Sequence, residues 1–289
     1  MEISLSQHGF QLQLLQELGG SVRSFTLEGQ DILFPAAAPS PGNPLETAGF
    51  PLFPFSGRIN DAAFRWNGRD ITLKGNFAPE PHAIHGQAWL SGWKVDALTD
   101  ASAHLSFEYQ PGDWPWAYKA TQAFEILPDG LRVSLSLTNL SDETMPAGLG
   151  WHPYFPRGDA RLSANVSGIW WADAGMIPDT LAALGPDTDL RHDREVDRLR
   201  LDHAFKAQPA NVDIIWPSRK LRVSMTSSDE LGHLVVFVPV GKDFFCAEPV
   251  SHAPDAVNSG HPASVTGLRS LPPGETLRAS IFLKVERLS

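Results

Sequence analysis

A single carboxylate, that of Glu248, lies in an apolar stretch near the C-terminal end of the chain. Its neighbours are Cys246, Ala247, Pro249 and Val250, and a loop that contains proline and serine follows. Desolvation in such surroundings raises the pKa of a carboxyl group toward neutrality, as a general base working near pH 7 requires. A structural pair with an arginine, or an exposed position at a strand end, fits the same residues equally well. Glu248 is therefore a candidate base whose role the local sequence leaves open.

A histidine in a second motif can supply the complementary acid. His152 lies in the run Gly-Trp-His-Pro-Tyr-Phe, residues 150–155, with three aromatic neighbours and a proline directly after it. Such neighbours hold an imidazole in one orientation, and an ordinary pKa near 6.5 lets it donate a proton at neutral pH. A satisfied histidine of the core has the same surroundings, so this interpretation also stays open.

Two charged residues elsewhere are further candidates for a functional site. Arg58 lies in an apolar segment stiffened by prolines, residues 51–60, where its rigid fork of donors requires a carboxylate or several ligand oxygens. Asp202 precedes His203 in a short polar pair, for which a turn-forming aspartate is the simpler interpretation.

The histidine pair His82 and His85 is the obvious place to look for a metal ligand set. Only a helix would align side chains at this spacing, and the flanking Pro81 and Gly86 argue against a helix. No cysteine or further histidine completes a set with ligand spacing. We therefore expect no metal site and no cofactor, and we interpret His85 as a hydrogen-bonding side chain.

Composition excludes several classes of protein. The 289 residues carry a formal net charge of -10, which argues against nucleic acid as the main partner. One cysteine excludes an internal disulfide framework. The first residues have neither a basic nor an apolar segment, so we expect no signal peptide, and no apolar run approaches membrane-spanning length. The expected partner is a small polar molecule, with no membrane involved, and the expected compartment is the cytoplasm; no oligomeric state is predicted.

The spacing of apolar residues predicts an all-β fold. Residues 118–127 and 131–137 alternate between apolar and polar side chains, as half-buried antiparallel strands do. Asn67-Gly68 predicts a tight hairpin, because this pair adopts the positive φ angles of a type I′ turn. Residues 177–200 are interpreted as a loop with a helical turn. We expect one domain, residues 1–289, built as a large antiparallel β-sandwich.

Taken in series, the motifs resemble the aldose 1-epimerase (galactose mutarotase) family. They occur in the family's order over residues 43–258: an Arg-containing loop, a His-Gly, a Gly-Trp-His-Pro-Tyr-Phe, an Asp-His-x-Phe, and a Glu-Pro followed by an Asn. The Gly-Trp-His-Pro-Tyr-Phe run is the specific part. The resemblance implies a β-sandwich of the galactose mutarotase-like type, with a monosaccharide in a cleft on one sheet.

The resemblance also implies a reaction and a role for each residue. The α and β anomers of a free aldose would interconvert by ring opening and closure, without a cofactor. Glu248 would take the proton of the anomeric hydroxyl, and His152 would protonate the ring oxygen. His85 would form a hydrogen bond near the ring oxygen, and Arg58 and Asp202 would hold hydroxyl groups. Trp89 or Trp151 could cover the apolar face of a pyranose.

One departure from the family pattern bears on the substrate. Many members have Gly-Arg-x-x-Asn-Arg in the arginine loop, whereas this chain has Gly-Arg-Ile-Asn-Asp at residues 57–61 and lacks the second arginine. A phosphate or sulfonate would require additional basic groups, and Arg157 and Lys242 lie near the motifs in sequence. We expect a neutral aldose, with an anionic sugar such as a hexose 6-phosphate or a sulfosugar as the alternative.

Two other functions use the same cleft. A sugar-binding module without turnover would keep the cleft, although both proton-transfer groups are present in this chain. A lyase or glycosidase that acts on longer glycans would require a second carboxylate, which Asp202 could supply.

Overall fold

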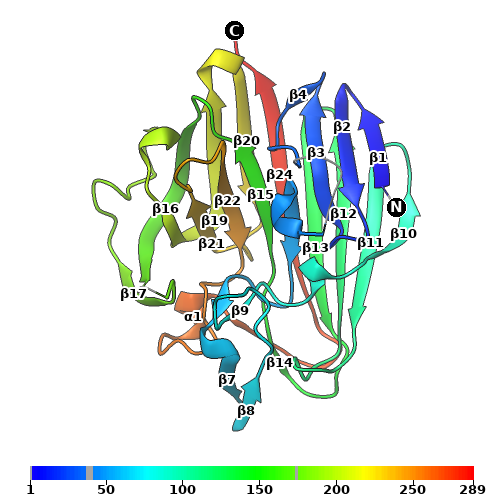
Figure 1. The fold of residues 1–289 in the computed structure, drawn as a ribbon, viewed down its shortest axis with the longest axis vertical. Helices are drawn as coiled ribbons and strands as arrows, with labels where there is room; N and C mark the ends of the chain where they lie inside the picture. Colours follow the sequence, from blue (N-terminus) through cyan, green and yellow to red (C-terminus); the bar gives the residue numbers. More distant parts are fainter. Residues whose placement is uncertain (1, 37–41, 173–174) are drawn as a thin grey trace.

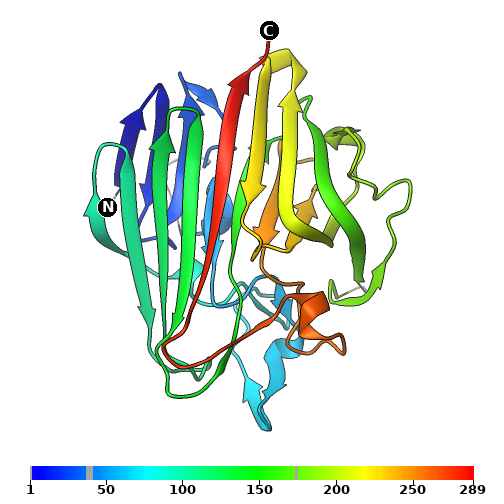
Figure 2. The ribbon, with the colours of Figure 1, turned by 180° about the vertical axis from the view of Figure 1, so that it is seen from behind.

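The computed structural model describes residues 2–36, 42–172 and 175–289. Eighteen strands belong to one continuous sheet, and three two-stranded ladders complete the β-structure. Every ladder between named strands of these residues is antiparallel, which confirms the predicted all-β, antiparallel fold (Figures 1 and 2).

The sheet folds over into two layers because one long strand belongs to both of them. The first part of β19 (Asp202–Trp216) pairs with β21 (His233–Phe237), and its last part pairs with β20 (Leu221–Ser227) along the same edge. Its other edge pairs with β16 (Arg161–Ala172) throughout. The predicted sandwich of two sheets is thus one sheet that divides at β19.

The back layer, seen in Figure 2, continues outward from β20. Its further strands are, in order, β24 (Thr276–Arg287), β13 (Gly130–Asn139), β12 (Tyr118–Leu127), β11 (Ser102–Tyr109) and β10 (Lys94–Leu98).

The front layer, seen in Figure 1, continues outward from β21. Its further strands are, in order, β22 (Phe244–Val250), β15 (Gly150–Pro156), β5 (Gly49–Leu52), β3 (Ser21–Leu27), β2 (Phe10–Leu15) and β1 (Glu2–Gln7). Short strands extend the edges: β4 (Gln30–Asp31), β17 (Pro178–Ala182) and β18 (Arg194–Glu195).

The two-stranded ladders gather at one end of the layers (Figure 1). The two-stranded ladders are β6 (Arg58–Ile59) with β9 (Ala83–Ile84), β7 (Ala63–Trp66) with β8 (Arg69–Thr72), and β14 (Met145–Ala147) with β23 (Arg269–Leu271). Helical turns are α1 (Ala263–Thr266) and the 3-10 turns η1 (Pro44–Glu46), η2 (Asn60–Ala62), η3 (Ala88–Leu90), η4 (Val196–Arg198) and η5 (Pro217–Arg219). None of the helices in the described ranges is long and apolar enough to cross a membrane.

Two local predictions have different outcomes. The Asn67-Gly68 hairpin is confirmed as the β7–β8 turn, with φ of 47° and 81° at these residues. The loop prediction for residues 177–200 is wrong in part, because β17 pairs with the edge of β16 there. The strand has little intrinsic β propensity, and pairing with Trp170 and Trp171 of β16 supplies its hydrogen bonds. The single-domain boundaries stay a prediction.

The apolar core fills the space between the layers. Strand alternation directs every second side chain inward, as in β12, where Phe124 is fully buried and the next residue, Glu125, is exposed. Phe25 of β3 and Phe155 of β15 reach the same core from the front layer. The opposite face of the front layer is thereby free to carry a site.

Phe124→Ala should lower the free energy of unfolding by about 3–5 kcal/mol, because it leaves a cavity between the layers. The neighbouring Glu125→Ala should change it by no more than about 1 kcal/mol, because it removes only a surface ion pair with Arg132, 2.9 Å long. Urea denaturation of both variants checks the inward and outward alternation; similar losses in the two would contradict it.

Candidate active site

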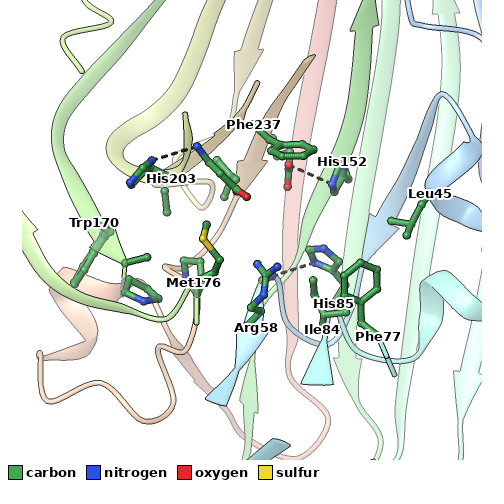
Figure 3. A pocket seen from close by; sticks show the side chains of 18 of the residues that line it. Leu45, Arg58, Phe77, Ile84, His85, His152, Trp170, Met176, His203 and Phe237 are labelled. Atoms are coloured by element: carbon green, nitrogen blue, oxygen red, sulfur yellow. Dashed lines mark hydrogen bonds and ion pairs between the residues drawn. The ribbon is translucent and has the colours of Figure 1, made fainter. Parts of the chain in front are cut away.

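A cleft of about 270 Å³ opens on the outer face of the front layer. Strands β15, β22, β21, β19 and β16 form its floor, and loops that include β6, β9 and η1 form its rim. Its volume suits a small ligand. Its lining is Leu45, Gly57, Arg58, Phe77, Ile84, His85, Trp89, His152, Tyr154, Trp170, Ala172, Met176, Pro178, Asp202, His203, Ala204, Val235, Phe237, Phe244, Glu248 and Pro254 (Figure 3).

All five residues predicted for the site line this one cleft: Arg58, His85, His152, Asp202 and Glu248. They come from five separate motifs of the chain. The structure thus brings the predicted residues together; the chemical role of each stays a prediction.

His152 and Glu248 face each other across two neighbouring strands. The register pairs Gly150 with Val250 and Tyr154 with Cys246, which places His152 directly opposite Glu248. Their side chains share the cleft face, and the imidazole Nε2 lies 3.2 Å from the carboxyl Oε1. Both side chains are buried, with exposed fractions of 9% and 4%.

The row of the sheet that contains this pair continues across the floor of the cleft. Val235 of β21 is paired with Glu248, Ala204 of β19 with Val235, and Trp170 of β16 with Ala204. Val235 and Ala204 are aliphatic and Trp170 is aromatic, so the floor beyond Glu248 is largely apolar over three strands, which lie about 4.8 Å apart.

Two aromatic rings hold the His152 imidazole. Phe50 packs against it at 4.5 Å between centroids and Tyr154 at 4.8 Å, with interplanar angles of 27° and 23°, and these two rings are themselves 6.2 Å apart. Among the described residues, the Nδ1 atom has no hydrogen-bond partner. The ring is therefore fixed by packing and presents Nε2 to the carboxyl group.

Burial determines how this pair holds its protons. It raises the pKa of Glu248 well above 4.5, with a further rise from Asp202 and an opposing effect of Arg58. Burial also lowers the pKa of His152 to about 3. Desolvation disfavours the charged form of both groups, so burial favours a neutral carboxyl group beside a neutral imidazole over a carboxylate beside an imidazolium.

Arg58 is anchored before any ligand arrives. Its Nε and one terminal nitrogen donate to the two carboxylate oxygens of Glu80, at 2.6 and 2.9 Å. Such a two-point pair fixes the plane of the guanidinium. The Asp202 carboxyl lies at the same cleft, where burial raises its pKa and the charge of Arg58 partly opposes that rise.

His85 is held in one tautomer by its backbone neighbours. Its Nδ1 accepts a hydrogen bond from the Gly57 amide at 3.1 Å, so its proton lies on Nε2. Burial lowers the pKa of His85 well below 6.5, so the ring is neutral. The residue has a φ of 59°, a rarely populated conformation for a residue other than glycine. Gly86 follows with a φ of 70°, and a Cβ there would lie 2.0 Å from the Phe53 carbonyl oxygen.

Several expectations about neighbouring residues are corrected. Trp89 lines the cleft, but Trp151 points into the core, because it alternates with His152 on β15. Arg157 does not line the cleft; it donates to the carbonyl oxygens of Pro239 and Lys242, at 2.8 and 3.3 Å. Lys242 does not line the cleft either, so neither basic residue near the motifs supplies a cation to the site.

Sequence analysis missed the residues that support the predicted ones. Glu80, which anchors Arg58, follows a proline in a loop and carries no pattern of its own. Phe50 of β5 lies about 100 positions before the histidine that it stacks on, and only the strand pairing brings them together. Tyr154 could have been found, because residues two apart on a strand share a face.

One group of three side chains in the described part of the chain has ligand atoms close enough for a metal ion. The atoms of His152, Cys246 and Glu248 lie within 4.8 Å of one another. Burial raises the pKa of the Cys246 thiol and of the Glu248 carboxyl, so both hold protons that a cation would have to displace. The donor set fits a proton-transfer pair better than a resident metal, and the absence of a metal site stays a prediction.

Comparisons with known proteins point to one family. A family model described as aldose 1-epimerase matches residues 1–284. The uncharacterised protein YphB of Escherichia coli K12 is 30% identical, with both chains covered completely. A solved putative aldose 1-epimerase of Escherichia coli K12 is 30% identical, with a TM-score of 0.91 over 100% of this chain and 99% of that one. A galactose mutarotase-like protein of Clostridium acetobutylicum shares the fold at 21% identity, with a TM-score of 0.88 over 99% and 95%.

The raised pKa of Glu248 predicts a pH-dependent stability. A glutamate of the unfolded chain ionises near pH 4.5, whereas the folded state keeps this proton to higher pH. The folded state then binds more protons, so the free energy of unfolding falls as the pH rises. Glu248→Gln removes this loss and should be more stable than the wild type by about 1–2 kcal/mol at pH 8, with little difference at pH 4.

Urea denaturation at the two pH values measures this difference. Glu125→Gln, at an exposed position of β12, is the matched control and should show no such pH-dependent gain. The difference in free energy of unfolding between Glu248→Gln and the wild type should be larger at pH 8 than at pH 4. The reverse order would contradict the raised pKa of Glu248.

Proposed function

The chain belongs to the aldose 1-epimerase family, and we propose that it is an isomerase that interconverts the α and β anomers of a free aldose by general acid/base catalysis. One observation carries this proposal: a buried imidazole and a buried carboxyl group are in direct contact on the floor of a cleft that suits a single sugar ring. Opening a hemiacetal requires one proton to be removed and one to be delivered at neighbouring oxygens, and this pair has the spacing for both.

The proposed reaction is balanced in protons. Glu248 takes the proton of the anomeric hydroxyl while His152 donates a proton to the ring oxygen. The bond between C1 and the ring oxygen breaks, and C1 becomes an aldehyde carbon. Rotation about the C1–C2 bond exposes its other face, and ring closure returns both protons to the pair. Each proton transfer can contribute about 10²–10⁴-fold to the rate.

The surroundings of the pair favour the ring-opening direction. With sugar bound, the reactive form is the carboxylate beside the imidazolium, and ring opening leaves a neutral carboxyl group beside a neutral imidazole. Burial stabilises this second form, because it raises the pKa of Glu248 and lowers that of His152. The net charge of the pair stays zero throughout, which suits a site with little water.

Three other residues are proposed to hold the sugar. The Nε2–H of His85 can donate near the ring oxygen, because the centroids of His85 and His152 lie 5.6 Å apart. Asp202 lies two residues from Ala204 on β19 and is positioned to accept from a hydroxyl beyond Glu248. Arg58, fixed by Glu80, donates to a hydroxyl between them.

A neutral sugar suits this charge distribution better than a phosphorylated or sulfonated one. Arg58 is the one lysine or arginine among the described residues that line the cleft, and Glu80 already neutralises it. Burial lowers the pKa of both His85 and His203, so neither ring adds a positive charge at pH 7. The negative charge of a phosphate or sulfonate would therefore lie in the same cleft as Asp202, with no unpaired positive charge among the described lining residues to balance it.

Removing either proton-transfer group tests the proposal directly. Glu248→Gln and His152→Ala should each lower kcat by about 10²–10⁴-fold while the protein stays folded. Anomer relaxation of freshly dissolved α-sugars, followed by polarimetry or exchange NMR, measures this loss. Cys246→Ala changes a buried residue of the same strand, in the neighbouring row opposite Tyr154, without removing a proton-transfer group, and should keep most of the activity. Wild-type turnover in Glu248→Gln would exclude this residue as the base.

The pH dependence should reveal the coupled pair. Activity requires the pair to hold one proton, so it is lost when a second proton binds and when the last one leaves. The acid limb of kcat/KM should follow the His152 pKa of about 3, and the alkaline limb should lie well above 4.5. Relaxation rates corrected for the buffer reaction measure both limbs. An acid limb between about pH 6 and 7, as for a solvated imidazole, would contradict the proposal.

A further inference from the structure

We propose that the cleft is built for an aldose whose C5 substituent carries no hydroxyl group, that is, a 6-deoxyhexose. This inference rests on the proposed function, because it uses the acid/base pair to orient the sugar. It follows from the order of the strands, the order of atoms in a pyranose, and the side chains that lie beyond His152.

The acid/base pair fixes the direction of the sugar ring along the sheet. The strands lie in the order β5, β15, β22, β21 and β19. The ring oxygen lies at His152 on β15, and the anomeric hydroxyl lies at Glu248 on β22. The path from C5 through the ring oxygen to C1 therefore runs from β15 toward β22. C2 and its hydroxyl lie toward β21 and Asp202, and C5 with its exocyclic group lies on the β5 side of His152.

The wall on that side consists mainly of carbon. Leu45, Phe77 and Ile84 lie together beside His85 and His152, on the side of the cleft away from Trp170, Met176 and His203 (Figure 3). These three side chains contain no hydrogen-bonding atom. We call them, together with Trp89, the C5 wall.

Most polar atoms near the C5 wall already have a hydrogen-bond partner or an assigned one. The Trp89 indole nitrogen donates to the Gly86 carbonyl oxygen at 3.0 Å. The Nδ1 atom of His85 accepts a hydrogen bond from the Gly57 amide, and its Nε2–H is the proposed donor to the ring oxygen. Tyr154 stacks on His152 and contributes a single hydroxyl group. Of the described residues that line this side of the cleft, none offers a carboxylate, an amide or an ammonium group to the exocyclic position.

A hydroxymethyl group and a methyl group on C5 differ in the free energy of burial against this wall. A hydroxymethyl group would exchange its hydrogen bonds with water for contacts with leucine, isoleucine and phenylalanine carbon, which is unfavourable. A methyl group gains from the same burial. Discrimination by an apolar pocket against an added hydroxyl is of the order of 10–100-fold.

Sugar pairs that differ only at C6 test this inference. Exchange NMR would give kcat/KM for D-fucose against D-galactose and for 6-deoxy-D-glucose against D-glucose. We expect the 6-deoxy sugar to be preferred by about 10-fold or more in the pair whose other hydroxyl configurations are accepted. An equal rate, or a preference for the hexose, in every accelerated pair would overturn the inference and leave the proposed reaction standing.

Binding to the Glu248→Gln variant separates the inference from the proposed reaction. Calorimetry with the same sugar pairs reports the preference of the cleft without turnover. Tighter binding of the 6-deoxy sugar, with no acceleration of any sugar by the wild type, would support the C5 wall and overturn the proposed reaction. Tighter binding of the hexose would overturn the C5 wall whatever the rates.

A substitution in the wall provides the matched variant. Leu45→Asn places an amide of similar size in the C5 wall and should shift the kcat/KM ratio toward the hexose by about 5-fold or more. Leu90→Asn is the control, because Leu90 is 48% exposed and does not line the cleft. It should leave the ratio unchanged. With both variants folded by circular dichroism, an unchanged ratio in Leu45→Asn would overturn the assignment of this wall to the C5 substituent.

Discussion

The contact between His152 and Glu248 depends on the register of two antiparallel strands. In β15 and β22, the residues on one face enter the core, and the residues on the other face form the floor of the cleft. Because the side-chain period of a strand is two, a slip by one residue would move the imidazole into the core and Trp151 into the cleft. Burial of Trp151 between the layers therefore also fixes the position of His152. The same sheet register that specifies the fold specifies the distance between the two groups.

This arrangement places two ionisable groups where burial opposes their charged forms. Their neighbours compensate by packing: Phe50 and Tyr154 stack on the imidazole, and the core beneath is dense with aromatic and aliphatic side chains. The large apolar core that the sheet encloses offsets the free-energy cost of burying these two ionisable groups. Sites that require perturbed pKa values are commonly less stable than the fold around them.

Patterns within a few residues predicted the strands and the motif residues. They could not predict which distant segments pair with one another. Alternation identified β12 and β13, and Asn67-Gly68 identified a hairpin, because both signals act within a few residues. Arg58 was singled out by its apolar segment, but its partner Glu80 has no local signal. That the sheet is continuous through β19 could not be predicted, since it depends on which edge of a long strand meets two others. The catalytic and binding roles assigned to the five site residues stay predictions that the geometry supports.

The proposed reacting groups and most of the proposed sugar-holding groups belong to different kinds of structure; Asp202, at the start of β19, is the exception. His152 and Glu248 are on central strands of the sheet, whereas Arg58, His85 and Leu45 are on short edge ladders and loops at the rim. Loops tolerate substitution, insertion and local opening far better than central strands do. During evolution, the rim of the cleft can therefore change from one sugar to another while the sheet below it keeps the same chemistry. A family with this division would be expected to diversify in substrate and to remain uniform in reaction.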